Sequence, residues 1–199
     1  MSDGPSQNEL LRVAVAVAEA VEQCGLRYSI GGSLASAVNG EPRSTLDVDI
    51  LVDLPPTSVD AFVRALGTDF YLDPDAVARA VRDHSSANVF HHHTSIKVDV
   101  FVAGDSVLER SQLDRRCRVH VTAGDLYVHS PEDLVLQKLH WYRLGGEVSD
   151  RQWRDTLGIL SVQHGRLDLA FMTRTAATIG LDALLKRALA ESDEPGPQD

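Results

Sequence analysis

Cysteine is scarce in this sequence, and so are the signals of export. The 199 residues include only Cys24 and Cys117, which are too few for a disulfide framework and lack metal-ligand spacing. We expect two buried or half-buried thiols in a reducing cytoplasm. The N-terminus has no basic region followed by an apolar run, so no signal peptide is expected. Residues 11–20 are apolar but too few to span a bilayer. These absences predict a cytoplasmic protein that does not contact a membrane.

Positive charge is also in deficit. Lysine and arginine number 19 against 29 aspartates and glutamates, which gives a net charge of −10. A broad nucleic-acid-binding surface is usually basic, so this balance argues against one. The negative net charge is still compatible with a local basic cleft, or with a substrate whose phosphates are bound to a metal ion. The basic cluster at Arg110, Arg115, Arg116 and Arg118 is expected to be a solvated face, and it is where an RNA or an acidic partner would be sought.

The apolar patterning divides the chain at about residue 130. Strand and helix patterns alternate up to His129, and only helical patterns follow. We predict an α+β fold: a small mixed β-sheet flanked by helices over residues 1–129, a C-terminal helical region over 130–191, and a disordered tail over 192–199. Strands are expected at 27–30, 46–52, 88–92, 96–102, 117–122 and 126–129, and helices at 7–24, 34–38, 59–66, from 73, 105–113, 131–144, 149–163, 167–179 and 181–190.

Two aspartates share one face of the strand expected at 46–52. Side chains alternate along a strand, so Asp47 and Asp49 point one way while Val48 and Ile50 point the other. Neighbouring carboxylates on a core strand repel each other and lose hydration, a cost that a bound cation removes. We therefore expect a divalent metal ion here. The alternative, a solvent-facing pair on an edge strand, is disfavoured by the apolar neighbours.

Two further pieces surround this strand. Gly31-Gly32-Ser33 lies between a strand and a helix, where glycine lets a ligand approach and the helix start presents free N–H groups to an anion such as phosphate. On its own this turn is a weak signal. Asp99 is a lone acid in the strand 96–102, and beside Asp47 and Asp49 it would complete a trio able to hold two metal ions. Asp99 could also take the proton of an acceptor hydroxyl, if neighbouring groups raise its pKa.

The order of these pieces resembles a known family. Gly31-Gly32-Ser33, then residues 43–50 (RSTLDVDI), then residues 97–102 (KVDVFV) look like the nucleotidyltransferase superfamily that shares its fold with DNA polymerase β. Within that superfamily the pattern resembles the small bacterial nucleotidyltransferases, which include abortive-infection toxins and minimal nucleotidyltransferases, over about residues 28–160. The resemblance implies a nucleotide site at Gly31, Gly32, Ser33, Arg43 and Thr45, and metal ligands at Asp47, Asp49 and Asp99.

The resemblance extends into the helical region. Residues 132–139 look like the family's helix with one lysine, so Lys138 would meet the triphosphate as a mobile point charge. Lys138 could equally be a solvated helix residue. Asp155 matches a recurrent acid of the following helix and is a further candidate; it could equally be the ion-pair partner of Arg151 or Lys138.

The resemblance implies a Mg²⁺- or Mn²⁺-dependent enzyme. It would move a nucleoside monophosphate from an NTP, such as ATP, to an acceptor hydroxyl and release pyrophosphate. The alternative is a non-catalytic module of the same fold that binds nucleotide or a partner protein, for example in a toxin–antitoxin or defence system. No motif identifies the preferred NTP, the oligomeric state or the acceptor, which is left open between a small molecule such as an antibiotic, tRNA and protein.

Histidines and aromatic residues offer rival signals. In a strand, His91 and His93 could share an ion while His92 points away, but no cysteine or spaced carboxylate completes a zinc geometry. We expect mostly exposed histidines at a hairpin end, with one lining a cleft as an alternative. Trp141, Tyr142 and Trp153 are expected to pack between helices rather than to stack on a base, although one of them could flank the acceptor pocket.

Overall fold

The computed structural model describes residues 6–39 and 47–192, which build an α+β fold around one mixed sheet. Its seven strands lie in the order β3-β4-β5-β2-β1-β7-β6. The β2–β5 and β1–β7 pairs are parallel, and the other neighbours are antiparallel. This confirms the mixed sheet that the patterning predicts. The strands are β1 (Tyr28–Ile30), β2 (Asp47–Val52), β3 (Phe70–Leu72), β4 (Ser86–His91), β5 (Lys97–Val102), β6 (Cys117–Val121) and β7 (Gly124–Val128).

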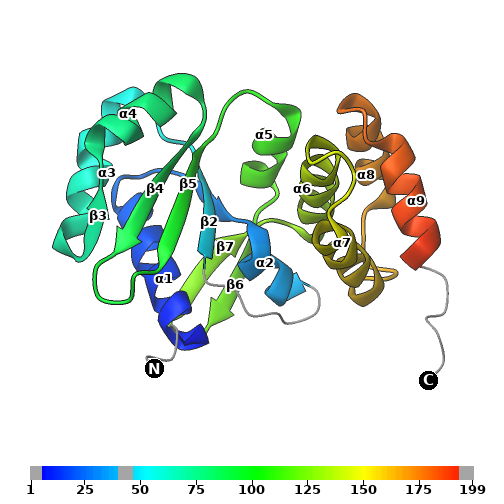
Figure 1. The fold of residues 1–199 in the computed structure, drawn as a ribbon, viewed down its shortest axis with the longest axis horizontal. Coiled ribbons are helices and arrows are strands. Elements are labelled where there is room, and N and C mark those ends of the chain that lie inside the picture. The colour runs from blue at the N-terminus through cyan, green and yellow to red at the C-terminus, as the bar shows by residue number, and fades with distance from the viewer. Residues whose placement is uncertain (1–5, 40–46, 193–199) are drawn as a thin grey trace.

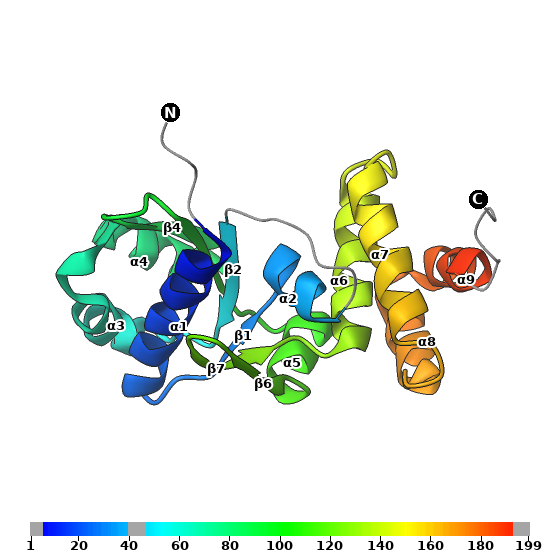
Figure 2. The ribbon, with the colours of Figure 1, turned by 90° about the horizontal axis from the view of Figure 1, so that it is seen from below.

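Helices flank the sheet and then continue without strands (Figure 1). Turned by 90°, the molecule shows α1, α3 and α4 to one side of β2, and α2 and α6 to the other (Figure 2). The described helices are α1 (Gln7–Gln23), α2 (Gly32–Asn39), α3 (Val59–Leu66), α4 (Pro74–Asp83), α5 (Val107–Asp114), α6 (Pro131–Leu144), α7 (Asp150–Val162), α8 (Leu169–Thr178) and α9 (Asp182–Ser192), with short 3₁₀ turns at Pro56–Ser58 and Gly67–Asp69.

The two central strands sort their side chains by face. Val48 and Ile50 on β2, like Val98 and Val100 on β5, are fully buried in the hydrophobic core. The residues between them point to the opposite face, because side chains alternate along a strand. The core therefore occupies one face of β2 and β5, and the charged residues emerge on the other.

The described chain contains only helices after β7. Ser130 begins α6 with its Oγ accepting a hydrogen bond from Asp133 N, and a proline follows at the first helical position. α6 packs against α2 and α5 as well as against α7, α8 and α9. The proposed division into residues 1–129 and 130–191 stays a prediction.

Several local expectations differ from the structure. The strand β3 was not predicted, because its three residues are too few to show alternation. Ser192 belongs to α9 rather than to the tail, and residues 193–199 lie outside the described part. Cys24 is half-buried as expected, but Cys117 is exposed. Among the described helices, none has the length and apolarity needed to cross a membrane.

Candidate active site

A cleft of about 760 Å³ opens between the charged face of the sheet and helices α6 and α7. It collects residues that lie more than 100 positions apart in the sequence, since both Gly31 and Asp155 line it. The predicted site residues among its lining are Gly31, Gly32, Ser33, Asp47, Asp49, Lys138 and Asp155. Arg43 and Thr45 fall in residues 40–46, outside the described part of the chain.

The glycine turn is held directly against the acidic strand. Gly31 N donates to the backbone oxygen of Asp49 at 2.9 Å, which ties the end of β1 to β2. A Cβ atom on Gly31 would lie 2.6 Å from His129 Nε2. A Cβ atom on Gly32 would lie 1.7 Å from Asp49 Oδ2, and Gly32 has a φ of +57°. A side chain at Gly31 would therefore displace His129, and one at Gly32 would displace Asp49, so the start of α2 lies directly beside a carboxylate.

The strand register places the three predicted carboxylates on one face. β2 and β5 pair in parallel with Asp49 opposite Asp99 and Asp47 opposite Lys97. Burial raises the pKa of the Asp49 carboxyl, and the negative charges of Asp99 and Asp47 raise it further. Repulsion among the acids is thus present in the structure, as the sequence predicts for Asp47 and Asp49.

Lys97 is a charged neighbour of the predicted carboxylates to which sequence reasoning gave no role. Its Nζ lies 2.8 Å from Asp99 Oδ2 and 3.9 Å from Asp47 Oδ1. The hydrogen bond to Asp99 raises the pKa of Lys97. Asp99 itself lies beside Asp49 but is not among the residues that line the cleft. The signal was available, since Lys97 precedes Asp99 by two positions in an alternating strand.

Two cations line the cleft from helices α6 and α7. Lys138 of α6 is 4% exposed, so it is not the solvated helix residue that was the alternative. Its Nζ lies 2.9 Å from Asp155 Oδ2, one of the two ion pairs that the sequence left open for Asp155. Arg151 of α7 donates from Nη2 to Ser33 Oγ at 2.8 Å, and so connects α7 to the start of α2. The sequence offered no signal for this contact, which joins residues 118 positions apart.

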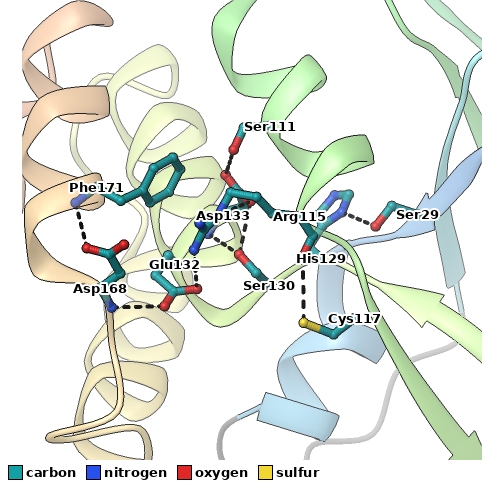
Figure 3. A network of polar contacts seen from close by, with 10 residues as sticks. All are labelled: Ser29, Ser111, Arg115, Cys117, His129, Ser130, Glu132, Asp133, Asp168 and Phe171. Carbon is teal, nitrogen blue, oxygen red and sulfur yellow. Dashed lines mark hydrogen bonds and ion pairs between the residues drawn. The ribbon is translucent and has the colours of Figure 1, made fainter.

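A buried histidine supports the glycine turn from behind. His129 Nδ1 lies 2.7 Å from Ser29 Oγ (Figure 3). The ring edge with Nε2 packs against Gly31. Burial lowers the pKa of His129 to about 3, which keeps the imidazole neutral. The turn therefore rests on an uncharged side chain.

Next to His129, a polar network joins three helices (Figure 3). Asp133 accepts hydrogen bonds from Ser111 of α5 at 2.7 Å and from Ser130 at 2.9 Å. Arg115 lies 3.7 Å from Asp133 Oδ2 and 3.4 Å from Glu132 Oε2, and its guanidinium lies over the ring of Phe171 of α8 at 3.9 Å. Contacts between α5, α6 and α8 thus fix the helix that carries Lys138.

These contacts correct part of the expectation that the four arginines between residues 110 and 118 form one solvated basic face. Arg115 is half-buried in the polar network, and Arg116 lies over the ring of Tyr127 at 4.8 Å. Arg118 is paired with Asp125 at 2.5 Å, and Arg110 is paired with Asp105. Arg110 and Arg118 are therefore solvent-exposed as expected, whereas Arg115 and Arg116 are half-buried and do not belong to a solvated face.

The structure also shows where the histidines and aromatic residues that suggested other kinds of site are placed. His91 Nδ1 lies 2.9 Å from Thr94 Oγ1 at the β4–β5 turn, His92 and His93 are exposed, and none of the three lines the cleft. Within residues 6–39 and 47–192, no three histidine, cysteine or acidic side chains are gathered in a ready metal-binding group. The rings of Tyr142 and Trp153 pack at 5.1 Å as expected.

Trp141 departs from the expectation of helix packing. Its side chain is 46% exposed and lines the cleft, with its ring 6.5 Å from that of Phe101. Phe101 follows Asp99 by two positions on β5 and so lies on the same face of the sheet. The cleft therefore has a charged end at the glycine turn and an aromatic end beyond it.

Comparison with known proteins agrees with this geometry at the level of the fold. No protein-family model and no curated protein matches the sequence. The structure is similar to an antigenic nucleotidyltransferase-like protein from Paracoccidioides brasiliensis, with a TM-score of 0.57, 17% identity, and coverage of 94% of this chain and 95% of that one.

Two antibiotic-resistance proteins are also similar. The antibiotic-resistance factor ANT(2'')-Ia gives a TM-score of 0.57 at 13% identity, covering 94% of this chain and 100% of its own. The lincosamide antibiotic adenylyltransferase LnuA, in its lincomycin-bound structure, gives 0.52 at 12% identity, covering 80% and 99%. At such low identity the likeness concerns the fold alone. The chain has the nucleotidyltransferase fold that its Gly-Gly-Ser turn and three-aspartate pattern predict.

Proposed function

We propose that this protein is a divalent-metal-dependent nucleotidyltransferase that transfers a nucleoside monophosphate from an NTP to an acceptor hydroxyl and releases pyrophosphate. The contact between the glycine turn and Asp49 carries the proposal. It places a phosphate-type helix start, with Gly32 against Asp49 Oδ2, at the edge of an acidic strand face. Transfer of this kind depends on positioning and charge neutralisation, which are the properties that such a junction supplies.

The triphosphate would lie between α2 and the helical region. The N–H groups at the start of α2 and the hydroxyl of Ser33 would bind phosphate oxygens. Lys138 of α6 and Arg151 of α7 would add positive charge from the other side of the cleft. Lys138 already contacts Asp155, and Arg151 already contacts Ser33 of α2. Arg43 and Thr45 remain part of the proposal through the motif resemblance alone.

The carboxylates have the chemistry that Mg²⁺ or Mn²⁺ requires. Asp47 and Asp49 offer hard oxygen ligands on one strand face and line the cleft. When bound, the ion would neutralise charge on the reacting phosphates and on the departing pyrophosphate. Asp99, opposite Asp49, would be the third carboxylate, either as a metal ligand or as the group that accepts the proton of the acceptor hydroxyl.

The names of two structural neighbours favour a small hydroxylated acceptor and ATP as the donor. One is an antibiotic-resistance factor and the other a lincosamide antibiotic adenylyltransferase. A small molecule that enters the cleft from its aromatic end, near Trp141 and Phe101, is therefore the first acceptor class to test. Transfer to tRNA or protein, and a role in a toxin–antitoxin system, are the other classes to screen.

The test is transfer of label from α-³²P-labelled NTPs to fractions of a cell lysate and to a panel of small hydroxylated compounds, with Mg²⁺. We expect the wild-type chain to label one fraction and to release pyrophosphate. Asp47→Asn and Asp49→Asn should abolish both while circular dichroism and thermal unfolding stay close to wild type. Full activity in either variant would contradict the site, and NTP binding without any labelled product would identify the non-catalytic module instead.

A further inference from the structure

Lys97 is a fourth charged residue on the acidic face of β2 and β5, and the proposed function gives it no role. The parallel register pairs Asp47 with Lys97 and Asp49 with Asp99. Neighbouring strands lie about 4.8 Å apart and alternate residues about 6.6 Å apart, so the four side chains form the corners of one small rectangle. Three corners carry carboxylates and the fourth carries an ammonium group.

The ammonium group contacts two of the three carboxylates. Lys97 Nζ lies 2.8 Å from Asp99 Oδ2, along its own strand, and 3.9 Å from Asp47 Oδ1, across the strand pair. The Lys97 side chain is 35% exposed and that of Asp99 is 18% exposed, so the shorter pair is partly withdrawn from water. Asp99 therefore already has a cation, whereas Asp49 lies against the glycine turn.

The charges of the rectangle then have a simple consequence for metal binding. Within this group of four residues, the ammonium group offsets the negative charge of one of the three carboxylates. Without the ammonium group, this face of β2 and β5 would carry one more unit of negative charge and would favour a second cation. A lysine ammonium is a compact point charge on a flexible stem, which suits this position.

We propose that Lys97 is the built-in cation of this face, so that the protein without nucleotide binds one divalent ion, at Asp47 and Asp49, rather than two. Its ammonium group holds Asp99 and occupies the place that a second ion would otherwise take. The inference rests on the proposed function, which assigns metal to these aspartates. Lys97 is thus a positioning residue, because it acts on the site through Asp99 and Asp47.

The experiment counts bound Mn²⁺ directly, without nucleotide or acceptor. The full chain is freed of metal with a chelator and titrated with Mn²⁺, while electron paramagnetic resonance reports the free ion. Lys97→Gln and Lys97→Met both remove the ammonium group, so one of them can replace the other if it folds poorly. Lys97→Arg keeps the charge. Lys186→Gln, an exposed lysine of α9, is the matched control for losing one positive charge elsewhere.

We expect one Mn²⁺ per chain in wild type, in Lys97→Arg and in Lys186→Gln. Lys97→Gln or Lys97→Met should bind a second ion, or bind the first on the order of tenfold more tightly, as expected for removing a unit charge about 5 Å from a divalent ion in a water-like medium. Equal counts with affinities within about twofold would overturn the inference, as would two ions in Lys97→Arg or the same change in Lys186→Gln. Absence of transfer activity with a changed Mn²⁺ count would overturn the proposed function but not this inference.

Discussion

Gly32 and Asp49 are in direct contact at the point where α2 begins. A Cβ atom on Gly32 would lie 1.7 Å from Asp49 Oδ2, well inside the distance at which non-bonded atoms can coexist. The proposed phosphate turn and the proposed metal carboxylate therefore cannot move independently of each other. A change in one should be detected in the other.

Gly32→Ala tests this coupling, with Gly25→Ala as its control. Gly25 also has a positive φ, +68°, but nothing lies within 4 Å of its Cβ position. Both variants place alanine in a left-handed conformation, which costs about 1–2 kcal/mol. We expect Gly32→Ala to lower the free energy of unfolding in urea by more than Gly25→Ala, and to weaken Mn²⁺ binding as Gly25→Ala does not. Equal losses of stability with unchanged Mn²⁺ affinity in both variants would contradict the coupling.

Local patterns were sufficient to predict the elements that carry the site. Alternation around Asp47 and Asp99 predicts two strands with acids on one face, and the glycine pair predicts a turn before a helix. These predictions succeed because side-chain alternation and glycine conformation are properties of a few consecutive residues. The C-terminal helices follow from periodicity in the same way.

The relationships between elements were not predictable from those patterns. The position of Lys97 opposite Asp47 depends on the register of two strands that are 50 residues apart, and a shift of one residue would move it to the other face. The contact of Arg151 with Ser33 depends on how α7 packs against α2. The burial of His129 depends on packing between distant parts of the chain, since its ring contacts Ser29, which lies 100 positions earlier. Tertiary packing decides each of these.

The ion pair of Lys138 and Asp155 gives a prediction about stability. Their side chains are only 5% and 13% exposed, and Nζ lies 2.9 Å from Oδ2. Removing one partner of a buried pair leaves an uncompensated charge and costs about 3–5 kcal/mol. We expect Lys138→Met to lower the free energy of unfolding by about 3 kcal/mol, and the double variant Lys138→Met/Asp155→Asn to lower it by less. Urea unfolding monitored by circular dichroism measures both.

An exposed ion pair serves as the reference for that measurement. Arg110 and Asp105 form a pair whose side chains are 63% and 92% exposed. Pairs at such positions contribute roughly 0–1 kcal/mol, so Arg110→Gln should leave stability almost unchanged. If Lys138→Met cost no more than Arg110→Gln, the pair with Asp155 would not be a buried interaction.

Arg151 gives a prediction about nucleotide affinity. It reaches Ser33 Oγ from α7 although its own side chain is exposed, so its removal should disturb the phosphate turn without unfolding the protein. We expect Arg151→Gln to raise the dissociation constant for NTP with Mg²⁺ about tenfold, equivalent to about 1.4 kcal/mol, as measured by calorimetry. Arg154→Gln, on the exposed side of the same helix, should bind as wild type does. Equal weakening in both variants would indicate a general charge effect and refute a specific role for Arg151.

His129 gives the pH prediction, because it is neutral when buried and can be protonated when the chain unfolds. Burial lowers its pKa to about 3, against an ordinary value of about 6.5 in the unfolded chain. Between these values the unfolded state binds the extra proton, so stability is complete above about pH 6.5 and falls as the pH decreases. Asp49 and Asp133 have raised pKa values and act in the opposite sense, so a variant comparison is needed.

We expect the wild-type free energy of unfolding to lose about 2 kcal/mol through His129 between pH 7.5 and pH 5, according to proton linkage. His129→Asn keeps a polar group near Ser29 but removes the titrating ring, so it should lack this loss even if it is less stable overall. Urea unfolding of both proteins at the two pH values gives the difference, in which the contributions of Asp49 and Asp133 cancel. Parallel pH profiles for the two proteins would show that His129 is already protonated or solvent-accessible in the folded state, and would remove the neutral support proposed for the glycine turn.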